Sequence, residues 1–265
     1  MEIQTSSILD TLVNISREAG DAILAIYNDE ERFQHVDMKA NDSPLTLADQ
    51  AAHELIVERL QKVTPEIPIL SEEGRDIPYE ERSQWTRFWL VDPLDGTKEF
   101  IKRNGEFTVN IALVEDQKVT MGCVYVPVKD LAFFAAKGEG AFVAREGNLG
   151  MPIQASTFSM DKEGLRIVCS RSHLTPEVEA YLNKLKQPEK VSMGSSLKFM
   201  VLAEGDADIY PRLGPTMEWD TGAAQIILEE AGGSVISEET HEPLLYNKEN
   251  LLNPFFIAYG DKVGE

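Results

Sequence analysis

The stretch Trp89-Leu90-Val91-Asp92-Pro93-Leu94-Asp95-Gly96-Thr97 is the most informative part of the chain, because an apolar run ends there at two aspartates three residues apart. The apolar run predicts a buried strand. Pro93 removes one backbone donor and restricts the chain, whereas Gly96 tolerates conformations that other residues avoid. Taken alone, the stretch also fits a strand followed by an ordinary turn. Oxygen ligands at such a turn suit a hard cation, so we expect a strand that delivers carboxylates to a Mg²⁺ site.

The composition predicts a folded, acidic protein with a substantial core. The chain has 265 residues, of which 43% are hydrophobic, and a formal net charge of −20. Nucleic acids and anionic membranes attract basic surfaces, so this charge argues against non-specific binding to either. No leader-like segment opens the chain, no segment approaches the roughly 20 apolar residues that span a bilayer, and the two cysteines lack metal-ligand spacing. We therefore expect a cytoplasmic protein without an integral membrane segment.

The first half of the chain mixes helical and strand-like patterns. Apolar residues at spacings of three and four predict an amphipathic helix over residues 8–27, and a second helical pattern follows Thr46, a suitable N-cap. A short strand over residues 67–70 runs into Ser71-Glu72-Glu73-Gly74. Strand-like runs between residues 107 and 143 predict an antiparallel meander. Both acidic motifs of this half therefore follow strands.

The rhythm changes near residue 160, beyond which strands and helices alternate. The later elements are expected at residues 166–169, 177–185, 196–203 and 221–231. We therefore expect two halves that share one cleft. Residues 1–160 form an α+β half with most of the candidate metal ligands, and residues 161–265 form an α/β half that completes the metal and substrate site.

Four carboxylates stand out by their positions. Glu72 and the pair Asp92 and Asp95 follow predicted strands, and Asp220 stands where Glu218-Trp219-Asp220-Thr221 opens a helix. Brought together without cations they would repel, since two like charges about 4 Å apart cost about 4 kcal/mol at an effective dielectric of about 20. Two or three Mg²⁺ ions would satisfy such a cluster. Paired ions can clamp a phosphate and activate water, so the pattern indicates phosphate ester hydrolysis.

Several of these acids also have a purely structural interpretation. Asp220 fits a helix N-terminal acid that the helix dipole favours, and Glu72 fits a solvated turn residue. Thr46-Leu47-Ala48-Asp49 fits a capping box, in which the Asp49 carboxylate only satisfies a backbone donor. The residue pattern leaves these alternatives open.

Four motifs follow one another along the chain. They are Ser43-Pro44-Leu45-Thr46-Leu47-Ala48-Asp49, Ser71-Glu72-Glu73, the segment Asp92 to Thr97, and Trp219-Asp220-Thr221-Gly222-Ala223-Ala224 with Glu230-Ala231-Gly232-Gly233. In order and spacing they resemble the lithium-sensitive magnesium phosphatases of the inositol monophosphatase superfamily, and the resemblance covers nearly the whole chain. It implies an α/β fold, a layered α/β/α/β sandwich whose cleft holds two to three Mg²⁺ ions.

The resemblance also implies a role for each matching residue. The implied metal ligands are Glu72, Asp92, Asp95, Asp220 and the backbone carbonyl of Leu94. Thr97 with Asp49 would orient and deprotonate the attacking water, and this role displaces the capping interpretation of Asp49. Gly96 and Thr97 would offer backbone donors to the phosphate.

Two strings resemble the CysQ type of bisphosphate nucleotidase more than the inositol phosphatases. They are Lys98-Glu99-Phe100-Ile101-Lys102-Arg103 and Tyr210-Pro211-Arg212-Leu213-Gly214-Pro215-Thr216. Inositol phosphatases usually place a glutamate where this chain has Leu213, whose apolar side chain cannot hydrogen-bond a polyol. The resemblance therefore implies removal of the 3′-phosphate from adenosine 3′,5′-bisphosphate, and from its sulfated relative, in sulfate assimilation. The candidate substrate-binding residues are Glu72, Leu94, Asp95, Gly96, Thr97, Lys98, Ser195, Ser196, Lys198, Arg212 and Asp220.

Two other functions stay open alongside this one. An inositol-phosphate or sugar-phosphate phosphatase would use the same metals but is disfavoured by Leu213. A metal-loaded nucleotide sensor without turnover is disfavoured because both Thr97 and Asp49 are present. The resemblance implies that this protein is a monomer or a homodimer. Some members of the superfamily attach to the cytoplasmic side of the inner membrane.

Overall fold

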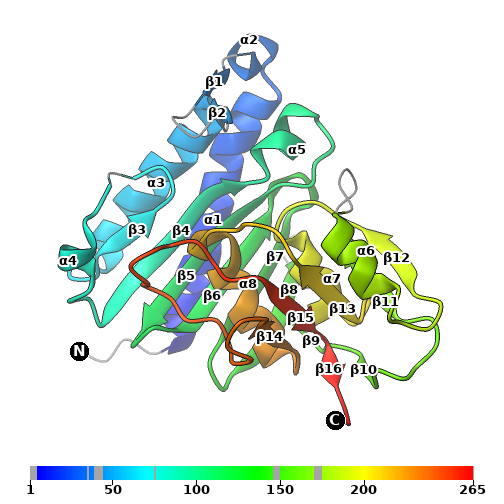
Figure 1. Cartoon of the computed structure of the whole chain (residues 1–265). Helices are drawn as coiled ribbons and strands as arrows, with labels where there is room; N and C mark the ends of the chain where they lie inside the picture. Colours follow the sequence, from blue (N-terminus) through cyan, green and yellow to red (C-terminus); the bar gives the residue numbers. More distant parts are fainter. Residues whose placement is uncertain are drawn as a thin grey trace.

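The stretch from Trp89 to Thr97 forms strand β4 of a seven-stranded sheet and the turn that follows it (Figure 1). The computed structural model describes residues 5–34, 36–38, 44–74, 76–145, 150–169 and 175–264. The strand order is β3-β4-β5-β6-β7-β8-β9, in which β3 pairs parallel with β4 and the remaining pairs are antiparallel, so the expected meander is confirmed. The strands are β3 (Ile69–Ser71), β4 (Arg87–Asp95), β5 (Thr108–Glu115), β6 (Lys118–Val126), β7 (Leu131–Ala136), β8 (Gly140–Arg145) and β9 (Met151–Ile153).

Two long helices cover one face of this sheet (Figure 1). The apolar stripe of α1 is buried against it, as the spacing of three and four predicts. Helix α3 begins after Thr46, whose hydroxyl accepts from the backbone N–H groups of Ala48 and Asp49. The predicted N-cap is therefore confirmed. The elements of this region are α1 (Thr5–Tyr27), α2 (Glu30–Phe33), β1 (Val36–Met38), β2 (Pro44–Thr46), α3 (Leu47–Val63), α4 (Tyr79–Arg82), α5 (Thr97–Ile101) and the 3₁₀ turn η1 (Pro127–Lys129).

A second sheet carries the C-terminal part of the chain, in the order β12-β11-β13-β15-β14. Helices α7 and α8 lie between the two sheets, and α6 packs on the outer face of the second one. The layers are therefore those of the expected α/β/α/β sandwich, with α6 outside them. The elements are β10 (Thr157–Phe158), β11 (Arg166–Cys169), α6 (Pro176–Leu182), β12 (Glu189–Ser192), α7 (Leu197–Ala203), β13 (Ile209–Arg212), α8 (Glu218–Glu230), β14 (Ser234–Ser237), β15 (Phe256–Tyr259) and β16 (Asp261–Lys262).

Helix α8 approaches the seven-stranded sheet closely because both surfaces carry glycine where they meet. A Cβ built on Gly122 of β6 would lie 2.8 Å from the backbone oxygen of Ala223, and one on Gly222 would lie 2.9 Å from Cδ2 of Leu90. The apolar core between the sheets draws residues from both sides of the proposed division near residue 160. The first turn of α8 is thereby held over the carboxyl end of β4.

Candidate metal centre

The turn after β4 is shaped by an irregularity in the pairing of β4 with β5. Asp92 pairs with Asn110 and Asp95 pairs with Thr108, so β4 holds one more residue than its partner over this interval. The Asp92 side chain is buried and accepts a hydrogen bond from the N–H of Leu94 at 3.0 Å. The chain therefore leaves the sheet with both carboxylates at its end, as the sequence predicts.

Gly96 completes the turn in a backbone conformation that disfavours other residues. Its φ is 95°, and a Cβ there would lie 3.1 Å from the Cβ of Ser195, in the turn that leads into α7. A side chain at this position would therefore be strained and would push the Ser195 turn away.

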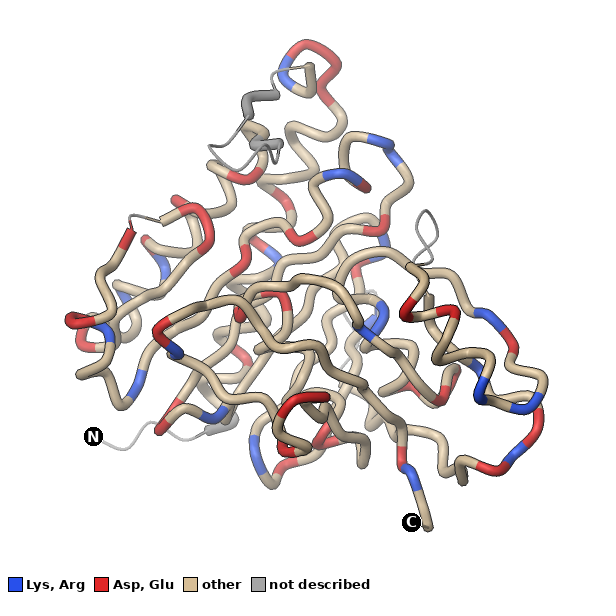
Figure 2. Tube along the Cα trace, viewed as in Figure 1, with Lys and Arg blue, Asp and Glu red and all other residues tan. Residues whose placement is uncertain are grey.

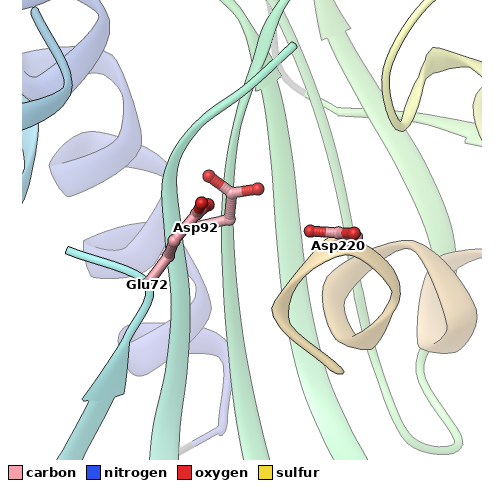
Figure 3. A group of neighbouring side chains, drawn as sticks. All are labelled: Glu72, Asp92 and Asp220. Atoms are coloured by element: carbon pink, nitrogen blue, oxygen red, sulfur yellow. The ribbon is translucent and has the colours of Figure 1, made fainter. Parts of the chain in front are cut away.

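Three carboxylates from three separate parts of the chain converge at this end of the sheet (Figure 3). Glu72 directly follows β3, where its N–H bonds the carbonyl of Val91, Asp92 belongs to β4, and Asp220 lies in the first turn of α8. One oxygen from each of the three lies within 4.8 Å of the other two. The structure thus brings together three of the four acids that the sequence singled out as ligands.

Burial and mutual repulsion make this cluster unfavourable without cations. The pKa of Asp92 is raised well above its usual range, first by burial and then by the charges of Glu72 and Asp95. Burial and the charge of Asp95 likewise raise the pKa of Asp220 to about 8. Each charged pair at such distances costs about 3 to 4 kcal/mol at an effective dielectric of about 20. A set of hard oxygen donors that resists ionisation therefore fits a divalent cation such as Mg²⁺.

The fourth acid, Asp95, is bound by Ser196, the residue that precedes α7. Its Oδ2 accepts from the N–H of Ser196 at 2.6 Å and from the Ser196 hydroxyl at 2.7 Å. The same hydroxyl lies 3.0 Å from the backbone carbonyl of Asp220. Asp95 is outside the group of three, yet its charge acts on both Asp92 and Asp220. Ser196 therefore joins the turn after β4 to the first turn of α8.

Asp49 completes the capping box of α3 and also accepts a hydrogen bond from Thr97. Its Oδ2 accepts from the N–H of Thr46 at 2.7 Å and so completes the capping box of α3. Its Oδ1 accepts from the hydroxyl of Thr97 at 3.3 Å. That hydroxyl is also 3.5 Å from the carbonyl of Leu94, another predicted ligand. The capping interpretation is confirmed, and it leaves one carboxylate oxygen of Asp49 directed at Thr97. Ser43, which opens this motif, lies outside the described residues.

A small pocket of about 70 Å³ adjoins the carboxylates on the side of the second sheet. It is lined by Ser195, Lys198 and Arg212, together with Asp95 and Asp220. Lys198 is buried and donates to the carbonyl of Ser195 at 2.7 Å. Burial lowers the pKa of Lys198 to about 8, against the opposing charge of Asp95. Two positively charged side chains thus lie beside the acidic cluster, where they can bind an anionic group of a ligand.

Two of the residues in the quoted strings lie elsewhere. The exposed Lys98 is not among the residues lining this pocket, and Leu213 packs against the α6 side of the second sheet. Sequence reasoning also missed Glu106, whose carboxylate accepts from the N–H of Gly194 at 2.8 Å and holds the turn before Ser195. No local pattern announces this contact, because it joins residues 88 positions apart.

Comparison with known proteins gives one consistent match. The model of the inositol monophosphatase family matches residues 4–254. The 3′(2′),5′-bisphosphate nucleotidase CysQ of Salmonella typhimurium is 45% identical over 250 residues, which are 94% of this chain and 98% of that protein. CysQ of Escherichia coli strain K12 is 46% identical over 251 residues, with the same coverage of both chains. The crystal structure of CysQ from Bacteroides thetaiotaomicron, a bacterial member of the inositol monophosphatase family, is 42% identical with a TM-score of 0.86, and the match covers 99% of this chain and 100% of that one.

Proposed function

The chain belongs to the inositol monophosphatase family, and within it we propose that this protein is a metal-dependent phosphatase that removes the 3′-phosphate from adenosine 3′,5′-bisphosphate. One observation carries the proposal. The carboxylates of Glu72, Asp92 and Asp220 converge beside a pocket, and two positively charged side chains, Lys198 and Arg212, line that pocket. The similarity to bisphosphate nucleotidases over 94% of the chain supports the choice of substrate. The sulfated relative of this nucleotide is a second proposed substrate.

The proposed metal ions are Mg²⁺, two to three per site. Glu72, Asp92, Asp220, Asp95 and the carbonyl of Leu94 would hold them, since all five offer hard oxygen ligands. Magnesium bound there supplies positive charge that polarises water and neutralises phosphate oxygens. Asp92, Leu94 and Asp95 belong to β4 and Asp220 belongs to the first turn of α8, so the phosphate would meet a site already in position.

Asp49 and Thr97 are the proposed pair that handles the attacking water. The Thr97 hydroxyl donates to Asp49 Oδ1, so the lone pairs of the Thr97 oxygen can accept a hydrogen bond from water. As the water attacks phosphorus, its proton passes to the hydroxyl and the hydroxyl proton passes to Asp49. The capping bonds from Thr46 to Asp49 Oδ2 hold the carboxylate in one orientation throughout. Backbone N–H groups at Gly96 and Thr97 are the proposed donors to the phosphate.

The second phosphate of the nucleotide needs positively charged side chains beside the metal centre. Figure 2 shows Lys and Arg positions interspersed with the more numerous Asp and Glu positions along the described chain. Lys198 and Arg212 are therefore the proposed partners of the 5′-phosphate, with Ser195 and Ser196 beside them. Lys98 is proposed to reach the substrate from outside the pocket.

The proposal is tested by comparing adenosine 3′,5′-bisphosphate with adenosine 3′-monophosphate, which lacks the 5′-phosphate. With Mg²⁺ the bisphosphate should give AMP and phosphate at the higher kcat/KM. Lys198→Ala should remove most of that preference while release from the monophosphate persists. Equal kcat/KM for both substrates in the unmodified protein would contradict the proposed substrate.

The protein is further proposed to act in the cytoplasm as a monomer or homodimer on this small-molecule substrate. Among the described residues, no helix combines the length and the apolarity that crossing a bilayer requires.

A further inference from the structure

We infer that Arg82 is a positioning residue for the metal centre, because it fastens the loop that holds the first turn of α8 and hence Asp220. The inference rests on the proposed metal site. Arg82 ends α4, in the connection between β3 and β4 whose flanking strands lead to Glu72 and contain Asp92. Its side chain is buried, although arginine is ordinarily exposed.

The guanidinium of Arg82 binds a segment 165 to 167 residues further along the chain. It donates to the carbonyls of Lys248 and Glu249 at 2.6 and 2.7 Å and to the side-chain oxygen of Asn247 at 3.1 Å. The Asn247 amide returns a bond to the carbonyl of Arg82 at 2.6 Å. This segment belongs to the long connection between β14 and β15, which extends toward α4 in Figure 1. Four bonds thus lock α4 to that connection.

The connection between β14 and β15 also forms hydrogen bonds with the first turn of α8. The fully buried carboxylate of Glu218 accepts from the N–H of Asn247 at 2.6 Å, the N–H of Lys248 at 3.0 Å and the Lys248 ammonium at 2.6 Å. The Glu218 N–H in turn donates to the carbonyl of Leu251 at 2.9 Å. Asn253 adds bonds to the carbonyl of Met217 at 2.8 Å and to the hydroxyl of Thr221 at 3.0 Å. Asp220 is therefore bracketed by held residues on both sides.

The two sides of the metal centre belong to different layers of the fold. Asp92 lies on β4 and Glu72 follows β3, whereas Asp220 lies in the first turn of α8. The chain of bonds from Arg82 through Asn247 and Lys248 to Glu218 therefore fixes the position of Asp220 relative to the other two carboxylates. Groups that orient metal ligands typically change metal affinity by about 10- to 100-fold when they are removed.

The test is calorimetric titration of Mg²⁺ into metal-free protein, which needs no substrate and no turnover. Arg166 provides a matched control, since its guanidinium also binds a buried partner, Asp208, at 2.6 Å, in another part of the second sheet. Arg82→Ala should raise the dissociation constant for Mg²⁺ about tenfold or more, and Arg82→Lys, which keeps the charge but not the fork, should recover part of the loss. Arg166→Ala should lower the thermal midpoint yet leave the dissociation constant within about twofold.

Asn247→Gly gives a second, milder variant should Arg82→Ala fail to fold. It removes both side-chain bonds to Arg82, and its φ of 64° suits glycine, so it should also raise the Mg²⁺ dissociation constant. If Arg82 and Asn247 variants bind Mg²⁺ as tightly as Arg166→Ala does, Arg82 has only a general structural role and the inference fails. If the unmodified protein binds no Mg²⁺, the proposed metal site fails and the inference fails with it.

Discussion

Replacing Asp220 with asparagine should stabilise the metal-free protein while it destroys the metal site. Asparagine has nearly the same shape, and its amide oxygen can still accept the bond that Asp220 Oδ2 takes from the Met217 N–H at 2.9 Å. The charge alone is lost. Burial and the charge of Asp95 raise the pKa of Asp220 from 3.8 to about 8 in the native state. The unfolded chain, in which the carboxyl ionises freely, is therefore favoured as pH rises from about 4 to about 8.

The magnitude follows from that shift. About three pH units separate the ordinary pKa of an aspartate, 3.8, from pH 7. Each unit is worth about 1.4 kcal/mol, so the buried carboxyl lowers the free energy of unfolding by up to about 4 kcal/mol at pH 7. The side chain keeps some contact with solvent, which reduces the expected gain of Asp220→Asn to about 2 kcal/mol or more. At pH 4 the gain should be below about 1 kcal/mol, because the native carboxyl is then protonated.

Urea unfolding in EDTA at pH 7 and pH 4 measures both values. Asp116→Asn, at an exposed turn, is the control and should change the unfolding free energy by less than about 0.5 kcal/mol. Mg²⁺ added at pH 7 should stabilise the unmodified protein and not Asp220→Asn. Equal unfolding free energies of the two proteins at pH 7 without metal, or a gain of the same size at both pH values, would show that the Asp220 charge does not destabilise the native state.

Three further changes test other parts of the account. Asp49→Asn should lower kcat by about 100-fold or more while calorimetric Mg²⁺ affinity persists, and an unchanged kcat would remove Asp49 from water activation. Gly122→Ala should lower the urea-derived unfolding free energy by about 1–3 kcal/mol, because its Cβ would meet the Ala223 backbone, whereas Gly214→Ala, with open space around it, serves as the unstrained control. The kcat/KM for adenosine 3′,5′-bisphosphate should fall above about pH 8 as buried Lys198 loses its proton, and Lys198→Arg should abolish that fall; identical pH profiles would contradict the role of the ammonium.

The sequence predicts those features of the fold that depend on neighbours along the chain. The apolar stripe of α1, the N-cap at Thr46 and the antiparallel meander follow from periodicity and capping chemistry, and the structure confirms each. The convergence of Glu72, Asp92 and Asp220 needed more, because they lie on separate elements. Order and spacing of whole motifs supplied that information.

Contacts between residues that lie far apart in the sequence could not be predicted from the sequence. The bonds from Arg82 to the segment near Lys248, and from Glu106 to Gly194, join positions 166 and 88 residues apart. An arginine in a short charged helix is typically exposed to solvent. Arg82 is buried only because α4 packs against the β14–β15 connection. Asp49 shows the opposite case, because the capping box predicted from local sequence uses one carboxylate oxygen and the bond from Thr97 uses the other.

Phosphate release from adenosine 3′,5′-bisphosphate and from inositol 1-phosphate, measured side by side in Mg²⁺ and in EDTA, tests both the proposed substrate and the proposed metal dependence. Asp95→Asn, prepared in the same way, shows how much release comes from contaminating phosphatases. We expect Mg²⁺-dependent release with a clear preference for the nucleotide and almost none from Asp95→Asn. A preference for inositol 1-phosphate would contradict the proposed substrate, and no Mg²⁺-dependent release from either would contradict the proposed catalysis itself.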